Sequence, residues 1–173
     1  MKILITALLL GIAHAEPAKK LWPEKPFKHA VAYCYNPFYD TRGTAITFDD
    51  GSIHEGVIRS TTVRLDPDQT STLRKMLSTD TDAKHGGVLC YDPHHAFVFY
   101  DAEWKVTASI DICFLCSDYK SRPEGTSDKV DLAALKAFCT KIGLPVLKSS
   151  SDYTKLFYQE LPTKPEKQKE AEQ

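Results

Sequence analysis

The sequence predicts an α+β domain, in which a small antiparallel sheet with a central hairpin at about residues 96–114 is packed by about three helices. Runs of β-branched and aromatic residues lie in the early and central parts of the chain. Three other segments instead repeat apolar residues at helical spacing. The chain has 173 residues, of which 42% are hydrophobic, and this suits a single domain with its own core.

The early strands are predicted from two short runs and one longer run. Residues 30–35 and 44–48 are rich in β-branched and aromatic residues, and residues 56–65 form the longer run. An Asp-Asp-Gly turn signal at 49–51 follows the second run. We therefore expect three strands before the first helix.

The helices are predicted from their spacing and from their ends. Asp66 is a suitable N-cap, Pro67 fits the first helical position, and Gln69 completes a capping box. Apolar residues recur at helical spacing over 131–142 and again over 150–160. A glycine and then a proline follow the first of these two segments, as expected after a helix C-terminus.

The central hairpin is predicted from strands at 96–101 and 105–114, joined by a loop at 102–104. Such a three-residue loop favours Gly or Asn at its left-handed position. Trp104 occupies that position, so we expect its backbone to be strained.

In this register one face of the hairpin is apolar and the other carries polar side chains. The apolar face consists of the facing pairs Ala96–Ile110, Val98–Ala108 and Tyr100–Val106. On the polar face, His95 lies opposite Asp111 and diagonally next to Cys113. A shift by one residue would mix the two sets, which favours this register.

Four residues around the hairpin form a predicted metal site: Cys90, His95, Cys113 and Cys116. Thiolate and imidazole are usual ligands of zinc and copper, and two cysteines two residues apart form a common half-site. Four protein ligands would complete the coordination shell of a structural zinc ion. Copper is the alternative metal, because Cu(I) favours thiolate ligands. Asp111 would accept a hydrogen bond from the histidine ring.

The cluster lies in a stretch that resembles a pattern in uncharacterised secreted bacterial proteins. Residues 90–101 are CYDPHHAFVFYD and residues 110–116 are IDICFLC. The pattern in those proteins is C-[YF]-x-P-x-H, an apolar strand ending in F-Y-D, a turn, and I-x-[IV]-C-F-x-C. The resemblance implies that His95 is the matching histidine and that His94 occupies a variable position. It implies no activity, and the tryptophan departs from the Gly or Asn usual near that turn.

The remaining histidines and cysteines have simpler interpretations. His94 and His85 could be extra ligands, although a solvated histidine is the more frequent outcome for the latter, which lies in a loop. Cys139 falls on the apolar stripe of its helix and is expected to be a buried, inert thiol. Cys34 is either a core residue or a disulfide partner.

The same cluster allows two other functions. A structural disulfide would make the chain a metal-free binding or interaction module, with a recognition surface formed by the nearby aromatic residues Tyr91, Phe97, Phe99, Phe114 and Tyr119. Alternatively, Cys113 and Cys116 could be a thiol redox pair, although such pairs normally lie at a helix N-terminus. No catalytic residues are predicted, since no hydrolase or P-loop motif is present.

The N-terminal end of the chain predicts export. Residues 1–15 have the basic start, the short apolar run and the Ala-His-Ala end of a signal peptide cleaved after Ala15. Residues 16–28 are expected to form an extended arm, 29–161 the single α+β domain, and 162–173 a disordered tail. The protein would be secreted or periplasmic, with no membrane anchor.

The charge of the chain restricts its partners. The net charge is −1, which argues against a nucleic-acid binder, because such proteins normally present a basic face. A protein partner is compatible with this composition, but no sequence feature identifies one.

Overall fold

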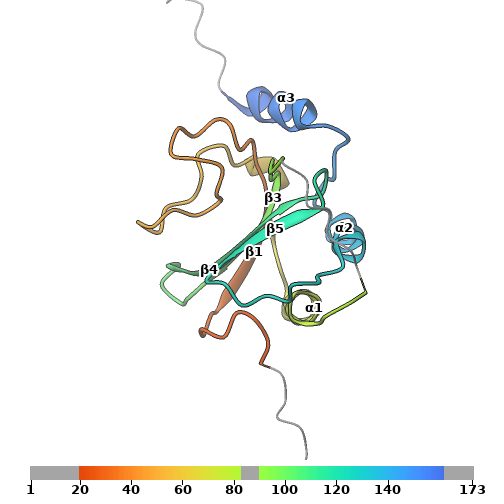
Figure 1. Cartoon of the computed structure of the whole chain (residues 1–173). Coiled ribbons are helices and arrows are strands. Elements are labelled where there is room, and N and C mark those ends of the chain that lie inside the picture. The colour runs from red at the N-terminus through yellow and green to blue at the C-terminus, as the bar shows by residue number, and fades with distance from the viewer. Residues whose placement is uncertain (1–19, 83–89, 162–173) are drawn as a thin grey trace, which may run out of the picture.

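The computed structural model describes residues 20–82 and 90–161 (Figure 1). The predicted signal peptide (1–15), the predicted tail (162–173) and the candidate ligand His85 lie outside the described residues. Within the described ranges, no helix has the length and apolar character needed to cross a membrane.

The sheet has five antiparallel strands in the order β2-β1-β3-β4-β5. The strands are β1 (His29–Cys34), β2 (Val63–Arg64), β3 (His95–Tyr100), β4 (Val106–Cys113) and β5 (Asp118–Arg122). The described part of the chain also contains the helices α1 (Pro67–Ser78), α2 (Leu132–Lys141) and α3 (Ser150–Glu160), and a short 3-10 turn at Arg59–Thr61. The predicted α+β class is therefore confirmed.

Helices α1 and α2 each have an N-cap residue whose side chain accepts a backbone hydrogen bond. The Asp66 carboxylate accepts the N–H of Gln69 at 2.7 Å, and the Gln69 side chain accepts the N–H of Asp66 at 3.0 Å. At the start of α2, the Asp131 carboxylate accepts the N–H of Ala134 at 2.9 Å. Each cap satisfies a backbone donor that helix geometry leaves without a partner.

Both faces of the sheet are covered. Helices α1 and α2 lie on one side of it, the helix face, and the connection at residues 35–57 lies on the other, the loop face (Figure 1). The strands contribute Ala30, Ala32, Cys34, Phe97, Phe99, Ala108, Ile110 and Ile112 to the helix-face core. They contribute Val31, Ala96, Val98 and Tyr100 to the loop-face core. As a result, every residue of β3 is buried.

Two of the three early strand predictions are largely wrong. Residues 44–48 contain only an isolated bridge, and of residues 56–65 only Val63–Arg64 is a strand. The buried His54 ring organises this connection instead, because it accepts the Gly56 N–H at 2.9 Å and donates to a backbone carbonyl at 3.0 Å. Such side-chain bonds to the backbone replace the hydrogen bonds of a strand ladder.

The β3–β4 hairpin contains a bulge that the sequence pattern did not reveal. Tyr100 pairs with Val106, as predicted. Phe99, however, pairs with Ala108, so Thr107 is an extra residue in β4. The predicted register is therefore wrong beyond the bulge. Because both faces of β3 are buried, the apolar pattern does not discriminate between the two registers.

The N-terminal arm packs against the domain over its described part. Trp22 is buried, its backbone N–H donates to the Ser78 hydroxyl at 2.7 Å, and its indole N–H donates to the Pro123 carbonyl at 2.9 Å. The Arg74 guanidinium donates to the three carbonyl oxygens of residues 21–23. The packed core therefore extends past the start of β1 into the arm.

Candidate functional site

A disulfide joins Cys90 to Cys116, with Cα atoms 6.1 Å apart. Cys90 lies in the segment that leads into β3, and Cys116 lies in the turn between β4 and β5. The bond connects positions that are 26 residues apart in the sequence. Two of the four predicted metal ligands are thus bonded to each other in this structure.

Cys113 is the last residue of β4 and has a free, buried thiol. Its sulfur accepts the backbone N–H of Cys116 at 3.1 Å, which places it inside the turn that carries the disulfide. The pair predicted for the redox alternative was Cys113 with Cys116. The structure joins Cys116 to Cys90 instead.

Two further thiols lie in the helix-face core. Cys34 and Cys139 are both buried and unbridged. Burial raises the pKa of Cys34 to about 12, and it raises that of Cys139 as well. Both thiols are therefore protonated and unreactive at neutral pH. The expectation of a buried thiol at Cys139 is confirmed.

His95 is buried on the helix face, where β3 pairs it with Ile112. Its Nε2–H donates to the Pro145 carbonyl at 2.9 Å. Burial lowers the pKa of His95 to about 4, and the Pro145 carbonyl opposes that shift. The neutral ring thus holds the segment between α2 and α3 against the sheet. Successive side chains alternate along a strand, so Asp111 and Cys113 point to the loop face, away from His95.

His94, the first candidate for an extra ligand, is also buried just before β3. Its ring stacks on Tyr153 of α3 with centroids 4.2 Å apart, and its Nε2 lies 3.1 Å from a carboxylate oxygen of Asp92. The hydroxyl of Ser150, at the start of α3, donates to the same carboxylate. His94 therefore connects the entry of β3 to α3.

Asp111 is fully buried on the loop face, and the bulge keeps it from the predicted position opposite His95. Its carboxylate accepts the Ile46 N–H at 2.9 Å and a hydrogen bond from the Arg122 guanidinium. Burial raises the pKa of Asp111, and these two donors oppose the rise. Through the hydrogen bond from Ile46, the carboxylate links the loop-face connection to the sheet.

The structure brings three of the predicted metal ligands together and separates the fourth. Cys90, Cys113 and Cys116 meet at the β4–β5 turn, whereas His95 faces Pro145. Over residues 20–82 and 90–161, no group of three or more His, Cys, Asp or Glu side chains is placed to hold a metal ion. Zinc binding and copper binding stay predictions, and either would require the disulfide to be open.

The aromatic residues near the cluster are mostly core residues rather than a recognition surface. Phe97 and Phe99 are fully buried, and Phe114 and Tyr119 pack half-buried against the same core. Among the described residues, the exposed aromatic side chains are Phe38, Tyr39, Trp104 and Tyr158. A binding surface built on exposed rings must therefore lie elsewhere.

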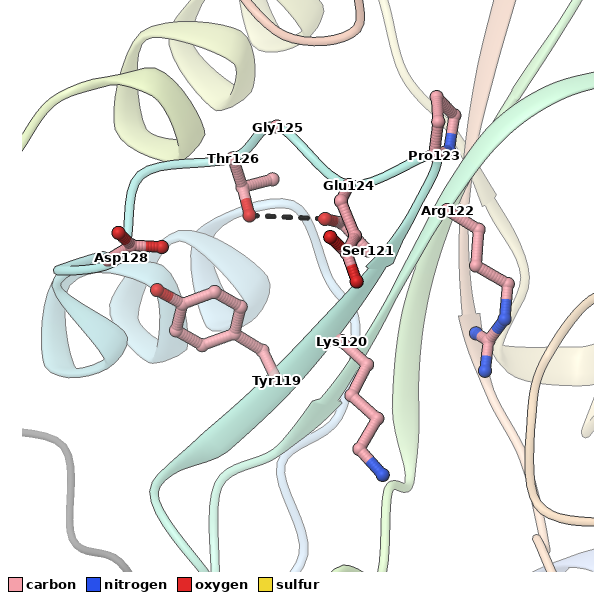
Figure 2. A pocket seen from close by; sticks show the side chains of 9 residues that line it. All are labelled: Tyr119, Lys120, Ser121, Arg122, Pro123, Glu124, Gly125, Thr126 and Asp128. Atoms are coloured by element: carbon pink, nitrogen blue, oxygen red, sulfur yellow. Dashed lines mark hydrogen bonds between the residues drawn. The ribbon is translucent and has the colours of Figure 1, made fainter.

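One hollow lies along the edge strand β5 and the loop at residues 123–128 (Figure 2). Tyr119 and Ser121 point toward this loop, whereas Lys120 and Arg122 point to the other side of the strand. The Ser121 hydroxyl bonds to a threonine hydroxyl of the loop at 3.2 Å. Side chains of both charges line the hollow, so its chemistry favours no ligand class.

A different hollow, the basic groove, has a volume of about 710 Å³ and lies between the starts of β1 and α1 and strand β2. Three cations line it: Lys28, Arg64 and Arg74. None of them forms an ion pair with a carboxylate in the described part of the chain. The lining carboxylate of Asp66 is engaged as the cap of α1.

Trp104 lies beside this groove, in the β3–β4 turn. Its ring is 50% exposed and its backbone is left-handed, with φ of 62°, so the predicted strain is confirmed. The His29 ring stacks on the indole at 4.3 Å. The Arg64 guanidinium lies 5.1 Å from the indole centroid and donates to the histidine Nδ1 at 2.8 Å. A left-handed backbone costs a residue with a side chain about 1–2 kcal/mol.

Sequence reasoning missed the basic groove because Lys28 lies far from Arg64 and Arg74 in the chain. The one signal for it was a tryptophan where the turn favours Gly or Asn.

No family model, no curated protein and no solved structure matches this chain. The resemblance to secreted bacterial proteins therefore stays a prediction, and the function has to be inferred from geometry and chemistry.

Proposed function

We propose that this chain is an exported binding domain, stabilised by the Cys90–Cys116 disulfide and without catalytic activity of its own. The observation that carries the proposal is the bond itself, which closes the open end of the central hairpin. Disulfides persist in the oxidising environment outside the cytoplasm, and the signal-peptide pattern of residues 1–15 predicts export to such an environment.

The reactive groups near the disulfide support a structural role. A thiol nucleophile needs a base within hydrogen-bond reach and a third group that orients the base. Cys113 and His95 belong to opposite faces of the sheet, and the histidine is bonded to the Pro145 carbonyl. Asp111, the third member of such a set, is bonded to Arg122 on the loop face.

Zinc binding by Cys90, Cys113 and Cys116 is the competing proposal. One observation favours it, because the Cys116 N–H donates to the Cys113 sulfur, as backbone donors also do to metal-bound thiolates. In that case the metal ion, rather than a disulfide, would supply the stability of this region.

Unfolding of the purified protein in urea separates the two proposals. If the disulfide is the source of stability, a thiol reductant lowers the free energy of unfolding by about 2–5 kcal/mol, and a chelator leaves it unchanged. The matched control is the double variant Cys90→Ser and Cys116→Ser, which should respond to neither reagent. Loss of structure on chelation alone would overturn the proposal in favour of zinc.

A further inference from the structure

We propose that the basic groove beside Trp104 binds an acidic saccharide, whose ring stacks on the indole and whose anionic group pairs with Arg64 and Lys28. The inference rests on the proposed function as a binding domain, and it names the surface and the class of ligand.

The groove carries positive charge that the described residues do not neutralise. Arg74 donates to backbone carbonyls, and Arg64 donates to the neutral ring of His29. Lys28 is exposed and forms no ion pair in the described ranges. The Asp66 carboxylate is occupied by the backbone of α1. An anionic ligand would therefore supply the counter-charge that the groove lacks.

Trp104 supplies a flat apolar surface next to these cations. Half of the residue is exposed, although the His29 ring, the Arg64 guanidinium and the Tyr100 ring all contact the indole. His29 and Arg64 line the groove, so they connect the indole to it. Saccharide rings present a face of C–H groups that packs on an exposed indole, while their carboxylate or sulfate groups suit the fork of a guanidinium.

The backbone of Trp104 adds a second argument. Asn or Gly would adopt the left-handed conformation with less strain, and a half-exposed ring does not fill the core. Strained conformations persist where the surrounding structure enforces them, and they concentrate at ligand sites. A ligand that uses the indole would account for the tryptophan at this position.

The size of the groove and the charge of the chain favour a saccharide over a nucleic acid. A volume of about 710 Å³ lies within the range of small-ligand sites. Nucleic acids also stack on aromatic rings, but they require a broad basic surface. The chain as a whole has a net charge of −1.

Isothermal titration calorimetry of the full chain, with its disulfide intact, tests the proposal with tetragalacturonate as the probe at low ionic strength. We expect saturable binding at one site, and neutral cellotetraose should bind at least about tenfold more weakly. Trp104→Asn, which suits the left-handed backbone, should weaken binding about tenfold, and Arg64→Gln should do the same. The matched control is Lys155→Gln, an exposed cation of α3, which should change the affinity by less than about twofold.

Three results would overturn the groove proposal: no binding of tetragalacturonate, equal affinity for the neutral saccharide, or tighter binding of a thymidine oligonucleotide of the same length. A thiol count on the same sample keeps this outcome separate from that of the proposed function. A bridged protein that binds no saccharide overturns the groove proposal alone. An unbridged, metal-bound protein that binds the saccharide overturns the disulfide proposal alone.

Discussion

The two ends of the β3–β4 hairpin differ in exposure, in charge and in what holds them. At the open end, the Cys90–Cys116 disulfide and the buried His95 close the structure. At the turn end, Trp104 is half exposed on a left-handed backbone beside cations that lack carboxylate partners among the described residues. The difference indicates that the open end serves stability, while the turn end carries features that stability alone does not explain.

The contrast has a physical basis in solvation. At the open end, His95 is buried and its Nε2–H is bonded to the Pro145 carbonyl, so removing one partner leaves the other unsatisfied away from water. At the turn end, Trp104 contacts His29, Arg64 and the ring of Tyr100, but half of the residue is exposed and each contact is individually weak. Substitutions should therefore cost more stability at the open end.

The largest effect should come from removing the disulfide. The double variant Cys90→Ser and Cys116→Ser should lose about 2–5 kcal/mol of unfolding free energy, because its unfolded chain regains conformational freedom. Urea unfolding followed by circular dichroism measures the loss. A change smaller than about 0.5 kcal/mol would show that the bond does not hold this end of the hairpin.

Acid should lower the free energy of unfolding through protonation of His95 at the open end. Its pKa is about 4 in the folded protein against 6.5 for an ordinary histidine, so the unfolded chain takes up the proton first as the pH falls. The stability contribution is complete above pH 6.5 and is lost between pH 6.5 and about 4, by about 3 kcal/mol in all.

Urea unfolding at a series of pH values measures this slope. His95→Gln should flatten it. The matched variant His29→Gln, at the turn end, should flatten it less, because the His29 ring is only half-buried, although desolvation and Arg64 lower its pKa too. Equal slopes in the wild type and in His95→Gln would refute the assignment.

Deleting Thr107 tests the bulge between the two ends. In the observed register Thr107 is extra, so its deletion leaves Phe99 opposite Ala108 and costs about 1 kcal/mol for one lost hydrogen bond. In a hairpin without a bulge, the same deletion would reverse the face of every later residue in β4 and unfold the domain. Thermal unfolding and a two-dimensional NMR spectrum distinguish the two outcomes.

The smallest effect should be that of Trp104→Asn on stability. Relief of the left-handed backbone returns about 1–2 kcal/mol, and the lost ring and guanidinium contacts remove about 0.5–1 kcal/mol each. The net change should lie within about 1 kcal/mol, as urea unfolding would show. A loss above about 2 kcal/mol would mean that the indole is part of the stabilising core.

The features that the sequence predicted well depend on neighbouring residues. The capping box of Asp66 and Gln69 specifies the start of α1, and the hairpin turn gives the Tyr100–Val106 pair. The left-handed position of Trp104 also follows from the turn alone. Each of these requires only a few consecutive residues, so local propensity determines them.

The features that the sequence did not predict depend on contacts between distant segments. The bulge at Thr107 shifts the register, and it places Asp111 and His95 on opposite faces. The apolar pattern did not indicate the bulge, because β3 is buried on both faces and its apolar side chains are buried in either register. The cations of the basic groove likewise come together only in the folded chain.

Peptide mapping of the exported protein, alkylated in denaturant without reductant, tests most directly whether a disulfide closes the open end of the hairpin. We expect Cys90 and Cys116 in one cross-linked peptide, and alkylated thiols at Cys34, Cys113 and Cys139. Alkylation of all five cysteines, together with stoichiometric zinc in the untreated protein, would contradict the disulfide and establish the metal site in its place.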